Sequence, residues 1–379
     1  MDFQLSEIQS MIKDTARDFA EKELGPIAAE IDRECRFPAE VVAQMGELGL
    51  MGIYISDDYG GAGADMLSYA LAVEEISRVC ASTGVTLSAH TSLACDPIAS
   101  FGTEEQKKKY LTPLASGEKL GCLALTEPGA GSDAGGGLVT ADREGDEYII
   151  NGTKNFITNG ETADIAIVMA KTDKTAGTKG ISSFIAENTF EGYNVGKKEH
   201  KLGINASTTT ELVFENMRVP AENLLGQEGK GFKVAMNTLN GGRIGIASQA
   251  VGIAQAAIEA SVKFAKERVQ FGKPIASFQA IQWMLADMQT RLDAARLLTH
   301  KAASLKDAGK NFIRESAEAK LYASEAATWI THKGIQIHGG YGYSKEYPVE
   351  RYYRDARITE IYEGTSEIQR PIISSTMLT

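Results

Sequence analysis

The stretch from Gly145 to Gly160, GDEYIINGTKNFITNG, decides the fold class of this chain. Its β-branched and aromatic residues form strand-length runs, and Glu144-Gly145-Asp146 and Asn151-Gly152 have the chemistry of turns. Runs of the same kind lie on both sides of it: CLALTEPG (122–129), ADIAIVMAKTD (163–173), GISSFIAE (180–187) and TTTELVFENMRVP (208–220). Short strands with no helical segment between them predict a small β-barrel or sandwich.

The sequence on either side of this β region has a helical period. Ser6 and Gln9 have capping-box spacing and begin an apolar stripe formed by Ile8, Met11, Ile12, Ala16, Phe19 and Ala20. After Gly231 the period returns, most clearly behind the candidate cap Ser277, in Ile281, Met284, Leu285, Met288, Leu292 and Ala295. The chain is therefore predicted to be a helical domain over about 120 residues, a β domain from Gly121, and a second helical domain.

Composition excludes several classes of protein. The 379 residues are 43% hydrophobic and 23% charged, which is ordinary for a globular protein, and 39 Lys and Arg against 50 Asp and Glu give a net charge of −11. An acidic chain does not suit broad nucleic-acid binding. No run approaches the roughly 18 apolar residues of a membrane span, and the start, MDFQLSEIQSMIKD, has no leader-like pattern.

The four cysteines predict neither a disulfide framework nor a metal site. They are scattered, without CxxC spacing or a nearby histidine cluster, at Cys35, Cys80, Cys95 and Cys122. We therefore expect a reducing, cytoplasmic location and no bound metal.

The segment TEPGAGSD (126–133) is dense in glycine but does not suit a dinucleotide-binding loop, because strand-like sequence follows it and such a loop must open a helix. Two interpretations remain open from the residues alone. The segment is a structural loop, or its Thr126 and Ser132 hydroxyls and free amides meet an anionic or carbonyl-rich ligand.

Two segments of the C-terminal part also carry two interpretations each, and a third carries one. In a continuous helix Glu360, Glu363 and Glu367 would share one solvated face, but Gly364 favours a backbone break that could leave Glu363 in an apolar pocket with a raised pKa. The glycines of QIHGGYG (336–342) are typical of a helix C-cap, where His338 is a base or a packing residue. RVQFGKP (268–274) is a helix end and turn.

Taken together, the chain resembles the acyl-CoA dehydrogenase family, and within it the short-chain (butyryl-CoA) enzymes. The segments that carry the resemblance occur in order along the whole chain: TEPGAGSD, NGTKNFITNG, KLGINASTTTELVFENMRVP, LNGGRIGIASQA, ERVQFGKPI, QIHGGYGY and YRDARITEIYEGTSEIQR. The resemblance implies a mainly α fold with a central β-barrel. It divides the chain into an N-terminal helical domain (1–120), a middle β-barrel domain (121–228) and a C-terminal four-helix bundle domain (229–379).

The resemblance also implies an FAD site between the barrel and the bundle of a homotetramer. Residues matching the family's cofactor contacts within one subunit are Leu123, Leu125, Thr126, Ser132, Phe156, Ile157, Thr158, Thr365 and Glu367. Those matching contacts to a neighbouring subunit's FAD are Arg268, Phe271, Gln279, Gln336, Ile337, Gly339 and Gly340.

For the reaction, Glu363 matches the family's catalytic base, which removes the α-proton of an acyl-CoA thioester while a hydride leaves the β-carbon for flavin N5. The positions matching substrate contacts are Ser132, Leu239, Asn240, Arg243, Tyr362 and Gly364. The implied partners are a short-chain acyl-CoA and electron-transferring flavoprotein.

Two positions depart from the common pattern of the family. Position 240 is Asn where many members have Asp, and LNGGR also occurs in branched short-chain (isobutyryl-type) enzymes. Position 156 is Phe where many members have Trp. Three other functions remain as alternatives to a straight-chain enzyme that uses electron-transferring flavoprotein. They are a branched short-chain dehydrogenase, an oxygen-using oxidase or monooxygenase on the same fold, and a non-catalytic acyl-CoA-binding or electron-transfer subunit.

Overall fold

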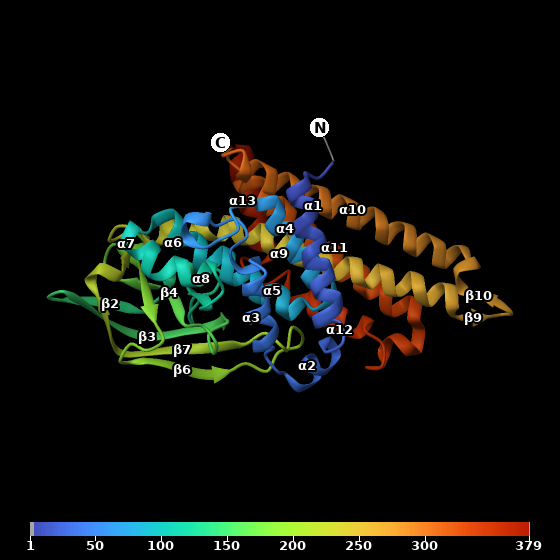
Figure 1. Cartoon of the computed structure of the whole chain (residues 1–379), viewed down its shortest axis with the longest axis horizontal. Helices are drawn as coiled ribbons and strands as arrows, with labels where there is room; N and C mark the ends of the chain where they lie inside the picture. Colours follow the sequence, from blue (N-terminus) through green and yellow to red (C-terminus); the bar gives the residue numbers. More distant parts are fainter. Residues whose placement is uncertain (1–3, 379) are drawn as a thin grey trace.

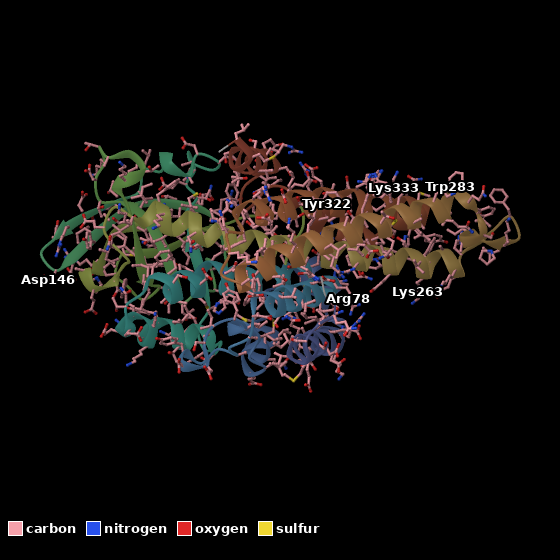
Figure 2. All side chains as sticks on the ribbon, turned by 90° about the horizontal axis from the view of Figure 1, so that it is seen from above. Arg78, Asp146, Lys263, Trp283, Tyr322 and Lys333 are labelled. Carbon is pink, nitrogen blue, oxygen red and sulfur yellow. The ribbon has the colours of Figure 1, made fainter. Side chains whose placement is uncertain are left out.

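The computed structural model describes residues 4–378 and has the predicted order of a helical region, a sheet region and a second helical region (Figure 1). The molecule is elongated. Seen from above, Asp146 lies at one end, on the hairpin of the sheet, and Trp283 lies toward the opposite end, on the long C-terminal helices (Figure 2). No helix formed by residues 4–378 has the length and apolarity needed to cross a membrane.

The N-terminal region is helical, as expected. Its α-helices are α1 (Glu7–Phe19), α2 (Ala28–Glu34), α3 (Ala39–Glu47), α4 (Met66–Val79), α5 (Ala81–Ala89), α6 (Asp96–Phe101), α7 (Glu104–Gln106) and α8 (Thr112–Ala115). Three π-helical segments continue α1, α5 and α7: η1 (Ala20–Leu24), η4 (His90–Cys95) and η5 (Lys107–Leu111).

Helix α1 begins as predicted but buries less of its stripe. The capping box forms, with the Gln9 amide nitrogen donating to Ser6 Oγ at 3.2 Å and the Ser6 amide donating back to Gln9 Oε1 at 2.9 Å. Ala16 and Phe19 are buried, whereas Ile8 and Met11 are 58% and 60% exposed. The first turns of α1 therefore extend past the core, and the prediction of one continuous buried stripe is wrong there.

The middle region is a single sheet. Its strands are β1 (Gly121–Ala124), β2 (Thr140–Glu144), β3 (Glu147–Thr158), β4 (Ile165–Lys171), β5 (Ile181–Glu187), β6 (Tyr193–Lys198), β7 (Thr209–Pro220) and β8 (Leu224–Leu225). The order is β6-β7-β3-β2-β4-β5-β8, with β1 beside β4. The two ends of this order, β6 and the two-residue β8, are not paired with each other, so the predicted closed barrel is not confirmed.

Strand β4 shows why this region has nearly continuous apolar runs. Ala166 and Val168 point to one face of the sheet, where they belong to a cluster that includes Phe184 and Phe214. The alternate residues Ile165 and Ile167 pack instead against N-terminal helices, in a cluster with Ile98, Leu111 and Leu114. Because successive side chains of a strand point to opposite faces, burial of both faces requires apolar residues at every position.

The C-terminal region contains three long helices and two shorter ones among the described residues. These are α9 (Gly231–Glu267), α10 (Gln279–Asp307), α11 (Ile313–His338), α12 (Val349–Ile358) and α13 (Ser366–Leu378), with the small hairpin β9 (Val269–Gln270) and β10 (Lys273–Pro274) between α9 and α10. Ser277 does not cap α10: its hydroxyl donates to the Pro274 carbonyl, and Phe278 occupies the N-cap without a side-chain bond. Met288, Leu292 and Ala295 of the predicted stripe are buried.

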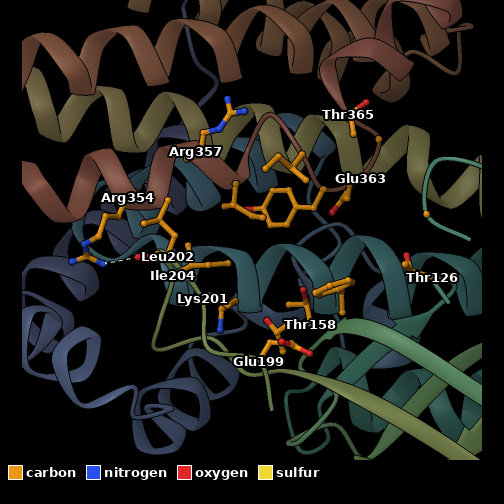
Figure 3. Close-up of a pocket in the computed structure, with 18 of the residues that line it drawn as sticks. Thr126, Thr158, Glu199, Lys201, Leu202, Ile204, Arg354, Arg357, Glu363 and Thr365 are labelled. Carbon is orange, nitrogen blue, oxygen red and sulfur yellow. Dashed lines mark hydrogen bonds between the residues drawn. The ribbon is translucent and has the colours of Figure 1, made fainter. Parts of the chain in front are cut away.

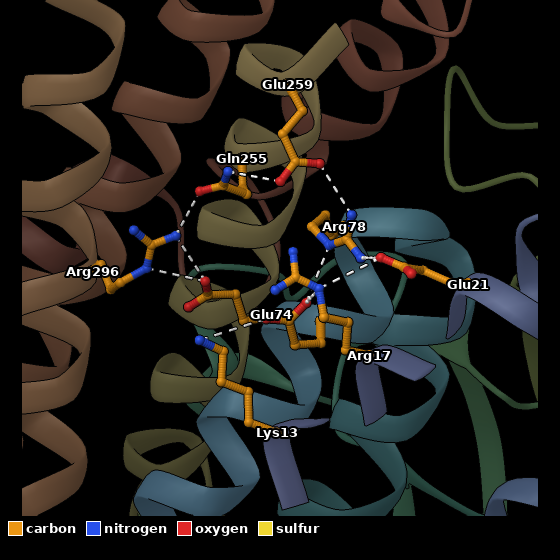
Figure 4. Close-up of polar contacts among 9 residues, drawn as sticks. Lys13, Arg17, Glu21, Glu74, Arg78, Gln255, Glu259 and Arg296 are labelled. Carbon is orange, nitrogen blue, oxygen red and sulfur yellow. Dashed lines mark hydrogen bonds and ion pairs between the residues drawn. The ribbon is translucent and has the colours of Figure 1, made fainter. Parts of the chain in front are cut away.

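Polar side chains join the two helical regions (Figure 4). Glu74 on α4 is buried and accepts from Arg296 on α10 at 2.8 and 3.0 Å, and Arg296 also donates to Gln255 on α9. Arg78, one turn further along α4, contacts Glu21, Glu75 and Glu259. Buried carboxylates need such partners, so the N-terminal helices are held against α9 and α10 in a defined orientation.

Candidate active site

Two cavities meet beside Glu363. The first, of about 540 Å³, lies between the sheet, the loop at 199–204 and the turn at 361–365 (Figure 3). The second, of about 410 Å³, continues from it between the 131–135 loop, helix α9 and the end of α5. Both are lined by Thr126, Ser132, Phe156 and Thr158 on the sheet side, and by Tyr362, Glu363 and Gly364 on the helical side.

Glu363 does not lie on a solvated helix face. It stands at a corner between α12 and α13, with φ of +53°, followed by Gly364 at +94°. Its Oε2 atom is buried without a hydrogen-bond partner among the described residues. Burial raises the pKa of Glu363 to about 7, against the opposing effect of the nearby cations of Lys320 and Arg243. The backbone break expected at Gly364 is present, and one oxygen of the Glu363 carboxylate is buried.

The residues around Glu363 fix its surroundings. Tyr362 Oη donates to Gln249 on α9. Gly242 of LNGGR leaves the space that the carboxylate fills, since a Cβ at 242 would lie 2.1 Å from Glu363 Oε2. Arg243 is buried and donates to Asn240 at 2.5 Å, and burial lowers its pKa to about 10. Leu239 and Arg243 line the second cavity.

The 126–133 loop is anchored by an ion pair that sequence reasoning did not single out. Glu127 Oε1 accepts from Lys154 Nζ at 2.7 Å, and both side chains are buried. The same carboxylate accepts from the amides of Leu138 and Val139, and Lys154 donates to the Leu125 carbonyl at 3.0 Å. The bridge sets Thr126 beside the cavities. In the sequence this ion pair is marked only by an acidic residue within TEPG, Glu127, and by a lysine in a strand-like run, Lys154.

The cofactor residues predicted on the sheet side come together. Leu123, Leu125 and Ile157 line the second cavity, and Thr365 lines the first. The Phe156 ring is 60% exposed at the cavities, on a backbone with φ of +55°. Glu367 lies outside both cavities, exposed in the first turn of α13.

The second predicted set gathers elsewhere. Arg268, Phe271, Ile337, Gly339 and Gly340 line a separate cavity of about 630 Å³ between the β9–β10 hairpin and the end of α11, and it shares no residue with the two beside Glu363. Gln279 and Gln336 are exposed residues of α10 and α11 that do not line it. Phe271 is 93% exposed there.

His338 is a packing residue. Its Nδ1 lies 2.8 Å from the Gly334 carbonyl oxygen, and its ring stacks on Phe264 with centroids 4.3 Å apart. Gly339, with φ of +60°, ends α11 as the C-cap pattern predicts. No group of three or more His, Cys, Asp or Glu side chains within residues 4–378 is arranged to hold a metal ion.

The raised pKa of Glu363 predicts a pH-dependent stability. A carboxyl that holds its proton up to about pH 7 when folded, against an ordinary value of 4.5, stabilises the fold at acid pH, and this contribution is lost as the pH rises from 4.5 to 7. We expect the free energy of unfolding of Glu363→Gln to equal that of the native protein near pH 4.5. Above pH 7 it should exceed the native value by up to about 3 kcal/mol. Urea unfolding across this range measures it. The exposed Glu325→Gln is the control, and equal curves for Glu363→Gln and native protein would contradict the buried carboxylate.

Comparison with known proteins places this chain in a family. Family models of the N-terminal, middle and C-terminal domains of acyl-CoA dehydrogenases match residues 6–118, 122–217 and 229–378. A short-chain specific acyl-CoA dehydrogenase of Clostridium acetobutylicum is 57% identical over 374 residues, covering 99% of each chain.

Two solved structures cover 100% of both chains with a TM-score of 0.99. One is butyryl-CoA dehydrogenase from Megasphaera elsdenii, 51% identical. The other, 53% identical, comes from work on the electron transferring flavoprotein of Acidaminococcus fermentans and flavin-based electron bifurcation. The chain belongs to the acyl-CoA dehydrogenase family of FAD-dependent oxidoreductases.

Proposed function

We propose that this chain is a short-chain acyl-CoA dehydrogenase of the butyryl-CoA type. It interconverts a short-chain acyl-CoA and its trans-2-enoyl-CoA and exchanges electrons with electron-transferring flavoprotein. The observation that carries this proposal is the unpartnered carboxylate oxygen of Glu363 at the junction of two cavities. The relatives named above are short-chain and butyryl-CoA enzymes and a protein from a flavoprotein study.

Glu363 is the catalytic base in this proposal. The α-proton of a thioester is weakly acidic, so its removal needs a base whose proton affinity is raised by desolvation. A pKa of about 7 for Glu363 suits a group that is partly ionised near neutral pH and gains the proton readily. Its Oε2 receives the α-proton, and the backbone N–H of Glu363 donates to the thioester carbonyl oxygen, where charge develops.

The residues of the first cavity fit FAD. Bound FAD supplies the acceptor for the hydride that leaves the β-carbon. The exposed Phe156 ring offers an aromatic face for a flat ring system, and the Thr126, Ser132 and Thr158 hydroxyls supply hydrogen bonds around it. Further contacts within the same subunit come from Thr365 of the first cavity. Leu123, Leu125 and Ile157 reach the cofactor from the adjoining part of the second cavity, and Glu367 reaches it from the first turn of α13.

The second cavity is the acyl-CoA site. Val85, Ala89 and Leu93 are buried apolar residues at its α5 end, where the acyl group ends. Tyr362 forms the wall beside the base, while Ser132 and Gly364 contact the thioester. Leu239 and Arg243 on α9 line the cavity, and they contact the CoA portion together with Asn240, the hydrogen-bond partner of Arg243.

We also infer that the enzyme is a homotetramer in which neighbouring subunits complete each FAD site. The argument is geometric: Arg268, Phe271, Ile337, Gly339 and Gly340 line a cavity that shares no residue with the Glu363 cavities, so within one chain they serve a different ligand position. Gln279 and Gln336 join this group. The highly exposed Phe271 is the kind of apolar side chain that a second copy covers.

The domain boundaries belong to this proposal too: 1–120, 121–228 and 229–379, of which residues 1–3 and 379 lie outside the described structure. Closure of the middle domain into a barrel, which the open strand order of the single chain does not show, and a four-helix bundle in the C-terminal domain are the finer parts of this proposal. Four free cysteines, three of them buried, support a reducing cytoplasmic location.

Replacement of the base tests the reaction. Glu363→Gln keeps the shape of the side chain but removes the proton acceptor, so we expect butyryl-CoA-dependent bleaching of the bound flavin to slow by about 10³-fold or more. Anaerobic stopped-flow absorbance at the flavin band measures this in protein that retains FAD. Near-native bleaching would refute the assignment.

Acyl length is tested by a kcat/KM series. Because the apolar end of the second cavity is lined by Val85, Ala89 and Leu93, we expect kcat/KM for butyryl-CoA to exceed that for octanoyl-CoA by at least about tenfold. Ala89→Leu removes space at that end and should move the preference toward propionyl-CoA. Isobutyryl-CoA, used in the same series, identifies a branched-chain enzyme if it is the better substrate.

Shared cofactor sites predict a particular effect of Arg268→Ala. The purified variant should carry less FAD, although Arg268 lies in a cavity separate from Glu363 within its own chain. The ratio of flavin to protein absorbance measures the loss, and sedimentation measures the assembly. Arg291→Ala, another arginine of the C-terminal helices that is exposed on α10, is the control. Full FAD content in both variants, or a monomer that retains FAD, would rule out shared sites.

A further inference from the structure

Lys320 is a wholly buried lysine next to the candidate base. It lies on α11 with 0% exposed surface. Lysine is almost never fully buried unless its ammonium group is satisfied. Here Nζ donates to the carbonyl oxygen of Gly364 at 2.7 Å. The bond is therefore made to the backbone of the residue that directly follows Glu363.

This carbonyl belongs to an uncommon backbone corner. Glu363 has φ of +53°, a conformation that is costly for a residue with a side chain, and Gly364 has +94°. The Gly364 carbonyl accepts a second bond from Gln369 Nε2 at 2.8 Å, and the same amide lies 3.3 Å from the Glu363 carbonyl oxygen. Such a conformation persists only when its surroundings impose it. Lys320 and Gln369 are the side chains that do so.

The charges around the corner come from several elements. Lys320 of α11 and Arg243 of α9 both lower the pKa of Glu363 against the stronger effect of burial. Burial lowers the pKa of Lys320 to about 8, where Glu363, Glu360 and Glu367 raise it and Arg243 lowers it. The hydroxyls of Tyr69 on α4 and of Tyr362 are the neutral titratable groups that feel the Glu363 charge.

Of the two cations, only Lys320 also holds the backbone of the corner. The Arg243 guanidinium is engaged with the Asn240 side chain. Lys320 thus acts on Glu363 in two ways, through a hydrogen bond that sets where the carboxylate is and through a charge that favours its ionised form.

We propose that Lys320 is a positioning residue for the reaction: its bond to the Gly364 carbonyl holds the Glu363 corner and places a positive charge next to the residue that carries the carboxylate. This inference rests on the proposed role of Glu363 as the base. Lys320 itself transfers no proton to or from the substrate.

The test compares flavin bleaching by butyryl-CoA in FAD-loaded native, Lys320→Met and Lys320→Arg enzymes across pH. The rate rises with pH as the base ionises. Without the cation, the midpoint of this rise should move to higher pH by about one unit, and the plateau at alkaline pH should fall about tenfold because the corner is less well held. Lys320→Arg keeps the charge and should retain the native midpoint. KM should change little in both variants.

Controls separate this role from a general effect on folding. Lys333→Met removes a lysine further along α11 that lies over Trp329 and should leave both midpoint and plateau unchanged. If Lys320→Met does not retain FAD, Lys320→Gln takes its place and should show the same midpoint shift. A lower plateau with an unmoved midpoint in the neutral variant, or native values of both, would overturn the inference. Glu363→Gln is measured alongside. If this variant bleaches at the native rate, the proposed function itself fails. If it is inactive while Lys320→Met has the native midpoint and plateau, only the positioning role of Lys320 fails.

Discussion

The rest of the site depends on one constraint, a carboxylate that has one oxygen buried without a partner and that feels the charges of two buried cations. Desolvation raises the proton affinity of Glu363, while Lys320 and Arg243 limit that rise so that its pKa stays near neutrality. Either influence alone would suit the proposed role of Glu363 less well: burial without cations favours the protonated group, and cations without burial leave a weak proton acceptor. The helices α9 and α11 supply one cation each, so the packing of these two helices is also an electrostatic requirement.

The sheet provides the opposite wall, and it is positioned by burial on both faces. Ile165 and Ile167 of β4 pack on N-terminal helices, while Val168 packs in the apolar cluster on the opposite face of the sheet. The Glu127–Lys154 bridge then ties the loop after β1 to β3, which brings Thr126 and Phe156 to the same cavities. A buried ion pair contributes little net stability but strongly disfavours alternatives in which one partner is unpaired. We infer that its main effect is on the placement of this loop.

Both helical regions contribute walls to the cavities beside Glu363. The end of the second cavity lined by Val85, Ala89 and Leu93 comes from α5 and η4, Glu363 from the corner after α12, and the opposing wall from the sheet. The buried contact of Glu74 with Arg296 fixes α4 against α10 and thereby sets α5, which follows α4 directly, relative to the C-terminal helices. Residues hundreds of positions apart in the chain thus line one volume, which explains why no single segment identifies the site.

The order of the three regions, the cap at Ser6, the C-cap at Gly339 and the special position of Glu363 before Gly364 could be predicted from the sequence, because periodicity, capping and glycine conformations are local properties. The exposure of Ile8 and Met11, the start of α10 at Gln279 without Ser277 as its cap, and the open strand order depended on tertiary contacts. The same holds for Lys154, which pairs with Glu127, and for Lys320, which bonds to the backbone next to Glu363. Lys154 and Lys320 lie in ordinary strand and helix patterns, and only burial beside a carboxylate or a strained corner turns such lysines into parts of a site.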